Sequence, residues 1–198
     1  MLLAVTVMVT LGIWVTGNLA NAATAIGFIA ARVGGLDISP ALPVWLTPLS
    51  ATLVHGDFLH LLFNMALLYY CGRQIEAMIG PGPLIMLYLV GAFAAAVGQY
   101  ALGPTSVMPA IGASGAVSAV IGAYAVSFGK PKRIVASLRL NRWLNIAWLM
   151  AAWVVLQLIM TYVSGQLGLL IAVGAHIGGF IAGVALQRPL LLWRYRRA

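Results

Sequence analysis

The sequence predicts an all-α membrane protein whose chain crosses the bilayer six times. Of its 198 residues, 63% are hydrophobic and 7% are charged, and the mean hydropathy is +1.02. A soluble domain carries about 25% charged residues, so this chain cannot cover a water-facing surface. Long stretches without charge cover residues 1–31, 77–129 and 143–187. Lipid is therefore the expected solvent.

A membrane-crossing helix needs about 20 mostly apolar residues, so these stretches hold several spans. Glycine and proline interrupt them at residues 80–83, 103–104 and 164–165. The expected spans, in chain order, cover residues 2–20, 52–72, 84–102, 114–129, 143–163 and 167–187. We expect residues 1–198 to form one membrane domain.

Residues 21–51 are expected to form a long loop between the first two spans. Within it, residues 22–31 are apolar but too few to cross the bilayer, and glycines and prolines follow them. We therefore expect a short helix that lies in the membrane interface.

The basic residues predict the orientation of the chain. Ten of the 11 lysines and arginines fall on one side of the six expected spans, and only Arg32 falls on the other. Because basic loops stay in the cytoplasm, both termini are expected there. The net charge of +8 is then a topology signal that also favours anionic lipid headgroups, and no nucleic-acid partner is expected.

Four polar side chains, His55, His60, Asn64 and His176, fall in or beside expected spans. Polar groups inside a membrane are costly and indicate a functional site, although each one could instead bond a neighbouring helix. Cys71, the single cysteine, is interpreted as a small buried hydrophobic residue.

Three of the polar residues are expected at one depth. The depth of each residue follows from the number of residues to the next basic residue, at 1.5 Å per residue. By this count the distances above the cytoplasmic end are about 24 Å for Ser114, 20 Å for His60 and 18 Å for His176. The span that begins at Ser114 is too short for a bilayer core of about 30 Å, so it should begin below the surface. The irregular loop before it should then line a cavity. Ser114 could also be a simple helix cap.

Small residues repeat every four positions beside Ser114 and beside His176. These stripes consist of Gly115, Ala119 and Ala123, and of Ala175, Gly179 and Gly183. Either stripe alone indicates only close helix packing. If the two stripes face each other, Ser114 and His176 come within reach as a nucleophile and a base.

His60 and Asn64 are four residues apart, so they share one helix face. With the Ser114 backbone N–H they could stabilise the oxyanion of an acyl-transfer reaction. His55 lies about 140° around the same helix and should not reach that point. We interpret His55 as structural, with a bond to the long first loop.

Four motifs resemble those of the rhomboid intramembrane serine proteases, in the right order and on the right spans. They are His55-Gly-Asp-Phe-Leu-His60-Leu-Leu-Phe-Asn64, Gly72-Arg-Gln-Ile-Glu76, Gly112-Ala113-Ser114-Gly115 and Ala175-His176-Ile-Gly-Gly179-Phe-Ile-Ala-Gly183. The resemblance implies a six-helix rhomboid-like bundle in which the long first loop is embedded in the membrane.

The resemblance also implies a catalytic dyad, with Ser114 as nucleophile and His176 as general base, and no acidic third member. His60, Asn64 and the Ser114 amide would form the oxyanion hole. Structural roles would fall to His55, Gly112, Gly115, Glu76, Gly179 and Gly183. The substrates would be single-pass or multi-pass membrane proteins, cut within the bilayer without metal or cofactor, in a bacterial inner (plasma) membrane. The oligomeric state is not implied.

Two positions depart from the family pattern. Many members carry an aromatic residue four positions after the serine, where this chain has Ser118. Many also carry Trp-Arg in the first loop, where this chain has Trp45-Leu46.

Other function classes fit the sequence less well. A transporter or proton channel would need acidic partners for the histidines, and the spans offer almost none. A catalytically inactive relative that binds or escorts membrane proteins is disfavoured by the intact Ser114 and His176. A metalloprotease would need H-E-x-x-H, and a soluble hydrolase would need G-x-S-x-G, but residue 116 is alanine.

Overall fold

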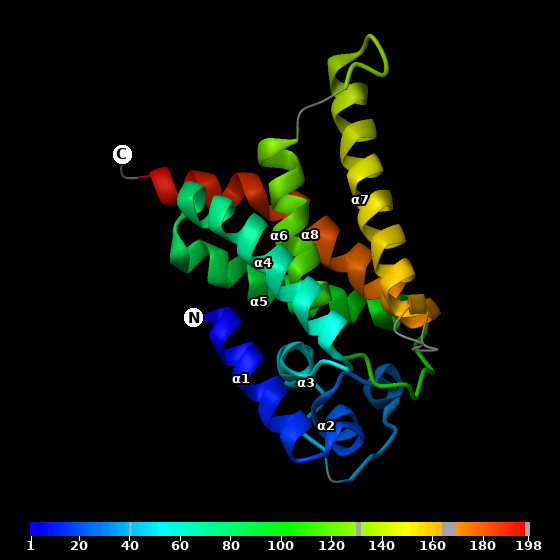
Figure 1. The fold of residues 1–198 in the computed structure, drawn as a ribbon. Coiled ribbons are helices and arrows are strands. Elements are labelled where there is room, and N and C mark those ends of the chain that lie inside the picture. Colours follow the sequence, from blue (N-terminus) through cyan, green and yellow to red (C-terminus); the bar gives the residue numbers. More distant parts are fainter. Residues whose placement is uncertain (40, 130–131, 164–168, 197–198) are drawn as a thin grey trace.

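The computed structural model describes residues 1–39, 41–129, 132–163 and 169–196, and within these ranges every regular element is a helix. Figure 1 shows the chain from the N-terminal segments to the C-terminal helix. The helices, in order, are α1 (Leu2–Val15), α2 (Leu19–Ile26), η1 (Ala30–Gly34), α3 (Thr47–Ser50), η2 (Ala51–Leu53), α4 (Phe58–Ile79), α5 (Pro81–Leu102), α6 (Ser114–Phe128), α7 (Leu138–Val163) and α8 (Leu169–Tyr195).

By length and composition, two segments of the described chain are able to cross a membrane, Pro81–Leu102 and Val173–Tyr195. A third span exists if Thr47–Leu53 and Phe58–Ile79 are counted together, although they meet at a bend of 106°. Leu2–Val15 and Ser114–Phe128 are apolar but shorter. The all-helical fold is thus confirmed, while the count of six spans stays a prediction.

The second expected span begins later than predicted. Helix α4 begins at Phe58 rather than at residue 52, because the Asp57 side chain accepts a hydrogen bond from the His60 backbone N–H (2.8 Å). This contact is an N-terminal cap, which satisfies one of the free N–H groups of the first turn. His55 therefore precedes the helix instead of lying within it.

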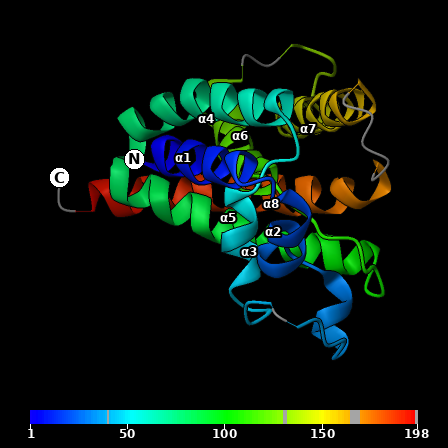
Figure 2. The ribbon, with the colours of Figure 1, turned by 60° about the horizontal axis from the view of Figure 1, so that its bottom comes forward.

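The segment between α1 and α4 is folded rather than a plain loop. It carries α2, η1, α3 and η2; α2 and α3 lie next to each other in both views (Figures 1 and 2), and α3 and η1 contact α5. Backbone hydrogen bonds join it to the strand-like approach to α6. Phe28 and Ala110 exchange two of them (3.0 and 2.8 Å), and Gly112 N–H donates to Ala51 O (2.9 Å). The first loop thus holds in place the backbone that leads to Ser114.

Helices α6 and α8 pack at backbone distance through the two stripes of small residues. A Cβ atom at Gly179 would overlap the carbonyl oxygen of Gly115, and one at Gly183 would overlap that of Ala119. The stripes therefore face each other. This is the arrangement that was expected to bring Ser114 and His176 within reach.

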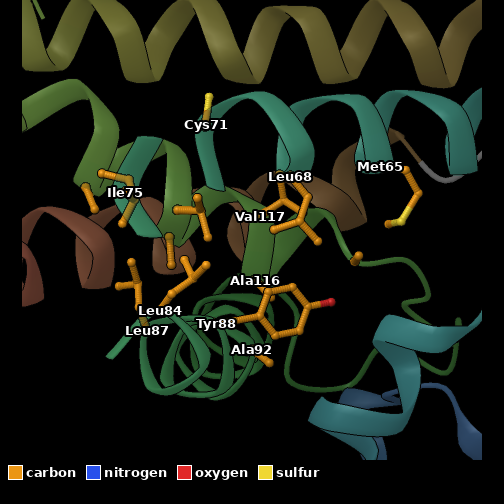
Figure 3. Close-up of a cluster of buried hydrophobic side chains, with 14 of the residues drawn as sticks. Met65, Leu68, Cys71, Ile75, Leu84, Leu87, Tyr88, Ala92, Ala116 and Val117 are labelled. Carbon is orange, nitrogen blue, oxygen red and sulfur yellow. The ribbon is translucent and has the colours of Figure 1, made fainter. Parts of the chain in front are cut away.

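An apolar cluster lies between α4, α5 and α6, and Figure 3 shows its central side chains. Leu68 and Ile75 of α4 meet Leu87 of α5 and Val117 of α6, all nearly or fully buried. Cys71 lies in the same cluster and is buried, as predicted. This cluster fixes α4, which carries His60 and Asn64, against the helix that begins at Ser114.

Candidate active site

Ser114 and His176 form a hydrogen-bonded pair between α6 and α8. The Nε2 atom of His176 lies 2.9 Å from the Ser114 hydroxyl oxygen, and His176 and Ser114 are only 2% and 8% exposed. Ser114 is the first residue of α6, where the backbone N–H groups have no partner within the helix. The hydroxyl and the imidazole therefore meet at the N-terminal end of α6.

No acidic side chain orients the imidazole. The Nδ1 atom of His176 is buried and has no hydrogen-bond partner among the described residues. Asp37 is exposed, and Asp57 lies at the start of α4. A catalytic dyad of Ser114 and His176 stays a prediction. The described residues also contain no group of three His, Cys, Asp or Glu side chains that could hold a metal ion.

The His60 ring lies against the backbone two residues before Ser114. Gly112 has a φ of 107°, in the left-handed region that favours glycine, and a Cβ atom there would lie 2.5 Å from His60 Nε2. Glycine is thus needed at this position both for its conformation and for its lack of a side chain. The result is that His60 reaches the loop that leads into the pair.

Asn64 lies one turn below His60 on the same face of α4 and is buried. Its Nδ2 atom donates to the His60 carbonyl oxygen (2.8 Å), and its Oδ1 atom has no partner among the described residues. In this arrangement the amide nitrogen is bonded to its own helix. The predicted placement on the His60 face is present, and a role in an oxyanion hole stays a prediction.

His55 is structural in a different way from the one predicted. Its Nε2 atom accepts a hydrogen bond from the Ala113 backbone N–H (3.2 Å), so the proton must sit on Nδ1, which donates to Thr10 Oγ1 (3.2 Å). Thr10 in turn donates to the Leu53 carbonyl oxygen (2.9 Å). The side chain thus joins α1 to the residue before Ser114. It also contacts the His60 ring, with centroids 4.9 Å apart.

Glu76, to which the resemblance assigns a structural role, makes no side-chain hydrogen bond among the described residues. Its side chain is exposed, and only its backbone carbonyl accepts a bond, from Gly80 N–H (2.7 Å), within the described part of the chain. Gly115, Gly179 and Gly183, by contrast, lie at the close α6–α8 contact.

Sequence reasoning missed Trp153 of α7. Its ring lies edge-to-face with that of His176, with centroids 6.1 Å apart, and its Nε1 atom donates to Ser118 Oγ. Ser118 Oγ donates to the Ser114 carbonyl oxygen (2.7 Å). The available signal was the small residue Ser118, which leaves room for a large neighbour. Trp45, where the chain has Trp45-Leu46 in place of the family's Trp-Arg, is exposed.

Comparisons with known proteins identify the family of the chain. The Rhomboid domain family matches residues 43–193. The chain is 31% identical over 150 residues to the rhomboid protease GlpG of Yersinia enterocolitica, covering 75% of this chain and 49% of that protein. It is 30% identical to GlpG of Yersinia pestis over 74% of this chain and 48% of the relative.

A more distant relative is the rhomboid protease GluP of Bacillus subtilis, which is 25% identical over 146 residues. That match covers 73% of this chain but 27% of GluP. The chain thus spans between about a quarter and a half of the length of these relatives. The family match includes the segments that carry His60, Ser114 and His176. The chain therefore belongs to the rhomboid family.

Proposed function

We propose that this protein is an intramembrane serine endopeptidase that acts through a Ser114–His176 dyad. The observation that carries the proposal is the 2.9 Å contact between His176 Nε2 and the Ser114 hydroxyl, which is buried between two closely packed helices. A serine is a weak nucleophile until a neighbouring base takes its proton. Membership of a family of proteases supports the same reaction.

In the proposed reaction, Ser114 Oγ attacks a peptide carbonyl carbon while its proton moves to His176 Nε2. The negative charge that develops on the carbonyl oxygen needs donors that are already in place. The Ser114 backbone N–H, at the start of α6, and His60, against Gly112, are the donors we assign, together with Asn64. His176 then gives its proton to the leaving amine, and water hydrolyses the acyl-enzyme.

The proposed substrates are single-pass or multi-pass membrane proteins, cut within or beside a transmembrane helix. A helical substrate keeps its carbonyl groups in backbone hydrogen bonds, so the segment to be cut must first unwind. Glycine lowers helix stability by about 1 kcal/mol relative to alanine, so small or helix-breaking residues should favour cleavage. We place the protein in a bacterial inner membrane with both termini in the cytoplasm, because of its basic loops.

The test is cleavage of a transmembrane-helix substrate that contains glycine near its outer end, in liposomes that hold the purified protein. Wild-type protein should cleave it, and Ser114→Ala and His176→Ala should not. Ser127→Ala is the matched control, because Ser127 lies on the same helix and its hydroxyl donates to the Ala123 carbonyl oxygen (2.8 Å), away from Ser114. Cleavage that survives Ser114→Ala would refute the proposal, and substrate binding without cleavage by wild type would favour an escort role.

A further inference from the structure

Trp153 of a third helix, α7, contacts His176 directly and is linked to Ser114 through Ser118. Its ring lies edge-to-face with the His176 ring, at 6.1 Å between centroids and 62° between planes. Its Nε1 atom is bonded to Ser118 Oγ, and Ser118 is bonded to the Ser114 carbonyl oxygen. Trp153 is 4% exposed and Ser118 is fully buried. The contacts run unbroken from the imidazole to the backbone of the nucleophile.

Among the described residues, the His176 ring makes one hydrogen bond. Its Nε2 atom meets Ser114 Oγ, while its Nδ1 atom has no partner among the described residues. A single hydrogen bond sets the distance between two atoms but leaves the ring free to tilt about that bond. An edge-to-face aromatic contact restricts that tilt, because the interaction depends on the angle between the rings. The Trp153 ring supplies this second restraint.

Ser118 fixes the tryptophan in turn. The Ser118 hydroxyl accepts from the indole N–H and gives its own proton to the carbonyl oxygen one helical turn before it. A Cβ atom at Gly179 would lie 3.2 Å from Ser118 Cβ, so the space around this side chain is narrow. A small hydroxyl side chain therefore both fits beside α8 and leaves room for the indole of α7.

We propose that Trp153 is a positioning residue, held by Ser118, that keeps the His176 ring in the orientation for proton transfer from Ser114. This proposal rests on the proposed dyad function. The aromatic ring beside His176 thus comes from α7, while the position four residues after Ser114 carries the small Ser118. Trp153 itself touches neither the substrate nor the transferred proton, so its effect is on the rate of the chemical step.

The test uses a fluorophosphonate probe and the whole protein in detergent. Ser114 Oγ attacks the phosphorus, fluoride leaves, and the Ser114 proton passes to His176. Inactivation kinetics separate probe binding (KI) from the chemical step (kinact). Trp153→Phe keeps an aromatic ring, and Trp153→Leu keeps apolar volume without one. The matched control is Trp148→Leu, because Trp148 is on the same helix but 66% exposed.

We expect Trp153→Leu to lower kinact at least about 10-fold with KI unchanged, since small misplacements of reacting groups cost that much or more. Trp153→Phe should recover most of this loss, and Trp148→Leu should match wild type. Equal kinact values for the Phe and Leu variants would overturn the proposal, because packing alone would then explain the site. The melting temperature of each variant shows whether it is folded. The kinact of Trp153→Phe is compared with that of Trp153→Leu at equal stability.

Ser118→Ala provides an independent check. It should lower kinact in the wild-type background but not in Trp153→Phe, since the bond between the two side chains is already absent there. Equal losses in both backgrounds would show that Ser118 acts without Trp153 and would overturn that part of the proposal. Absence of labelling in wild type itself would instead count against the proposed dyad function, so the two failures are distinguishable.

Discussion

Gly112 shows how much of the site depends on one backbone position. Its φ of 107° is costly for any residue with a side chain, by about 1–2 kcal/mol, and its Cα faces the His60 ring. We expect Gly112→Ala to lower the melting temperature and to abolish labelling by a serine probe, because His60 and the Ser114 loop must separate.

Gly35→Ala is the control for this prediction. Gly35 has a similar φ of 99°, but a Cβ atom added there would meet nothing within 4 Å. This variant should lose stability by the conformational cost alone and keep its probe labelling. Full labelling of Gly112→Ala would show that the His60 contact is not required.

His55 is a second residue whose loss should reach the site from a distance. His55→Phe would leave the buried N–H of Ala113 without an acceptor, which costs about 1–3 kcal/mol. We expect a lower melting temperature together with slower labelling, since Ala113 directly precedes Ser114. Thr24→Val is a control, because Thr24 bonds the Ala20 carbonyl oxygen at an exposed position. Unchanged labelling of His55→Phe would contradict this role.

At the residue level, motifs indicated Ser114 and His176 correctly as neighbours, because each has a stripe of small residues on its own helix. Trp153 was beyond reach for a physical reason. Tryptophans recur at positions 143, 148 and 153 of one apolar helix, and nothing in that spacing says which one faces inward. Only the packing of α7 against α6 and α8 decides this.

Among the helices, the contact between α6 and α8 determines whether the pair can form. Gly183 lies two turns from His176, and a Cβ atom there would overlap the Ala119 carbonyl oxygen. We expect Gly183→Ala to destabilise the protein by about 1–3 kcal/mol, as other overpacked interiors do, and to slow labelling. Thermal unfolding and probe labelling measure both effects.

The control for this prediction is Gly12→Ala in α1, a helix glycine with nothing within 4 Å of an added Cβ. Alanine favours helix over glycine, so this variant should be as stable as wild type or more so. A stable and fully labelled Gly183→Ala would mean that the helices can separate without loss of the pair.

Element boundaries were predicted less well than element order. Hydropathy placed the second span at residue 52, whereas α4 begins at Phe58. The sequence did contain the signal, since Asp57 is a favourable capping residue. Hydropathy does not register a cap. The short helices of the first loop were also not predicted one by one, because they are too short to produce a clear apolar period.

For the whole molecule, the sequence predicts six spans, but the lengths of the helices do not establish that number. Helices α1 and α6 have 14 and 15 residues, which is about 21 and 23 Å. A bilayer core is about 30 Å thick, so each would need flanking residues or a thinner membrane to cross it. The placement of ten of the 11 basic residues on one side of six spans is consistent with that count.

The predicted topology is testable with single cysteines in a Cys71→Ser background. Arg139→Cys should react with a membrane-impermeant maleimide only from the cytoplasmic side, and Leu36→Cys only from the outer side, because basic loops are retained in the cytoplasm. Intact cells and inverted vesicles expose opposite faces. Reaction of both cysteines from the same side would contradict the six-span arrangement.

The most direct measurement of the central claim is labelling of the purified protein by a fluorophosphonate probe. It needs no knowledge of the substrate, because it reports only whether Ser114 is an activated nucleophile. We expect labelling of wild type and of Ser127→Ala, and none of Ser114→Ala or His176→Ala. A folded wild-type protein that does not react, or a His176→Ala variant that reacts at the wild-type rate, would contradict the dyad.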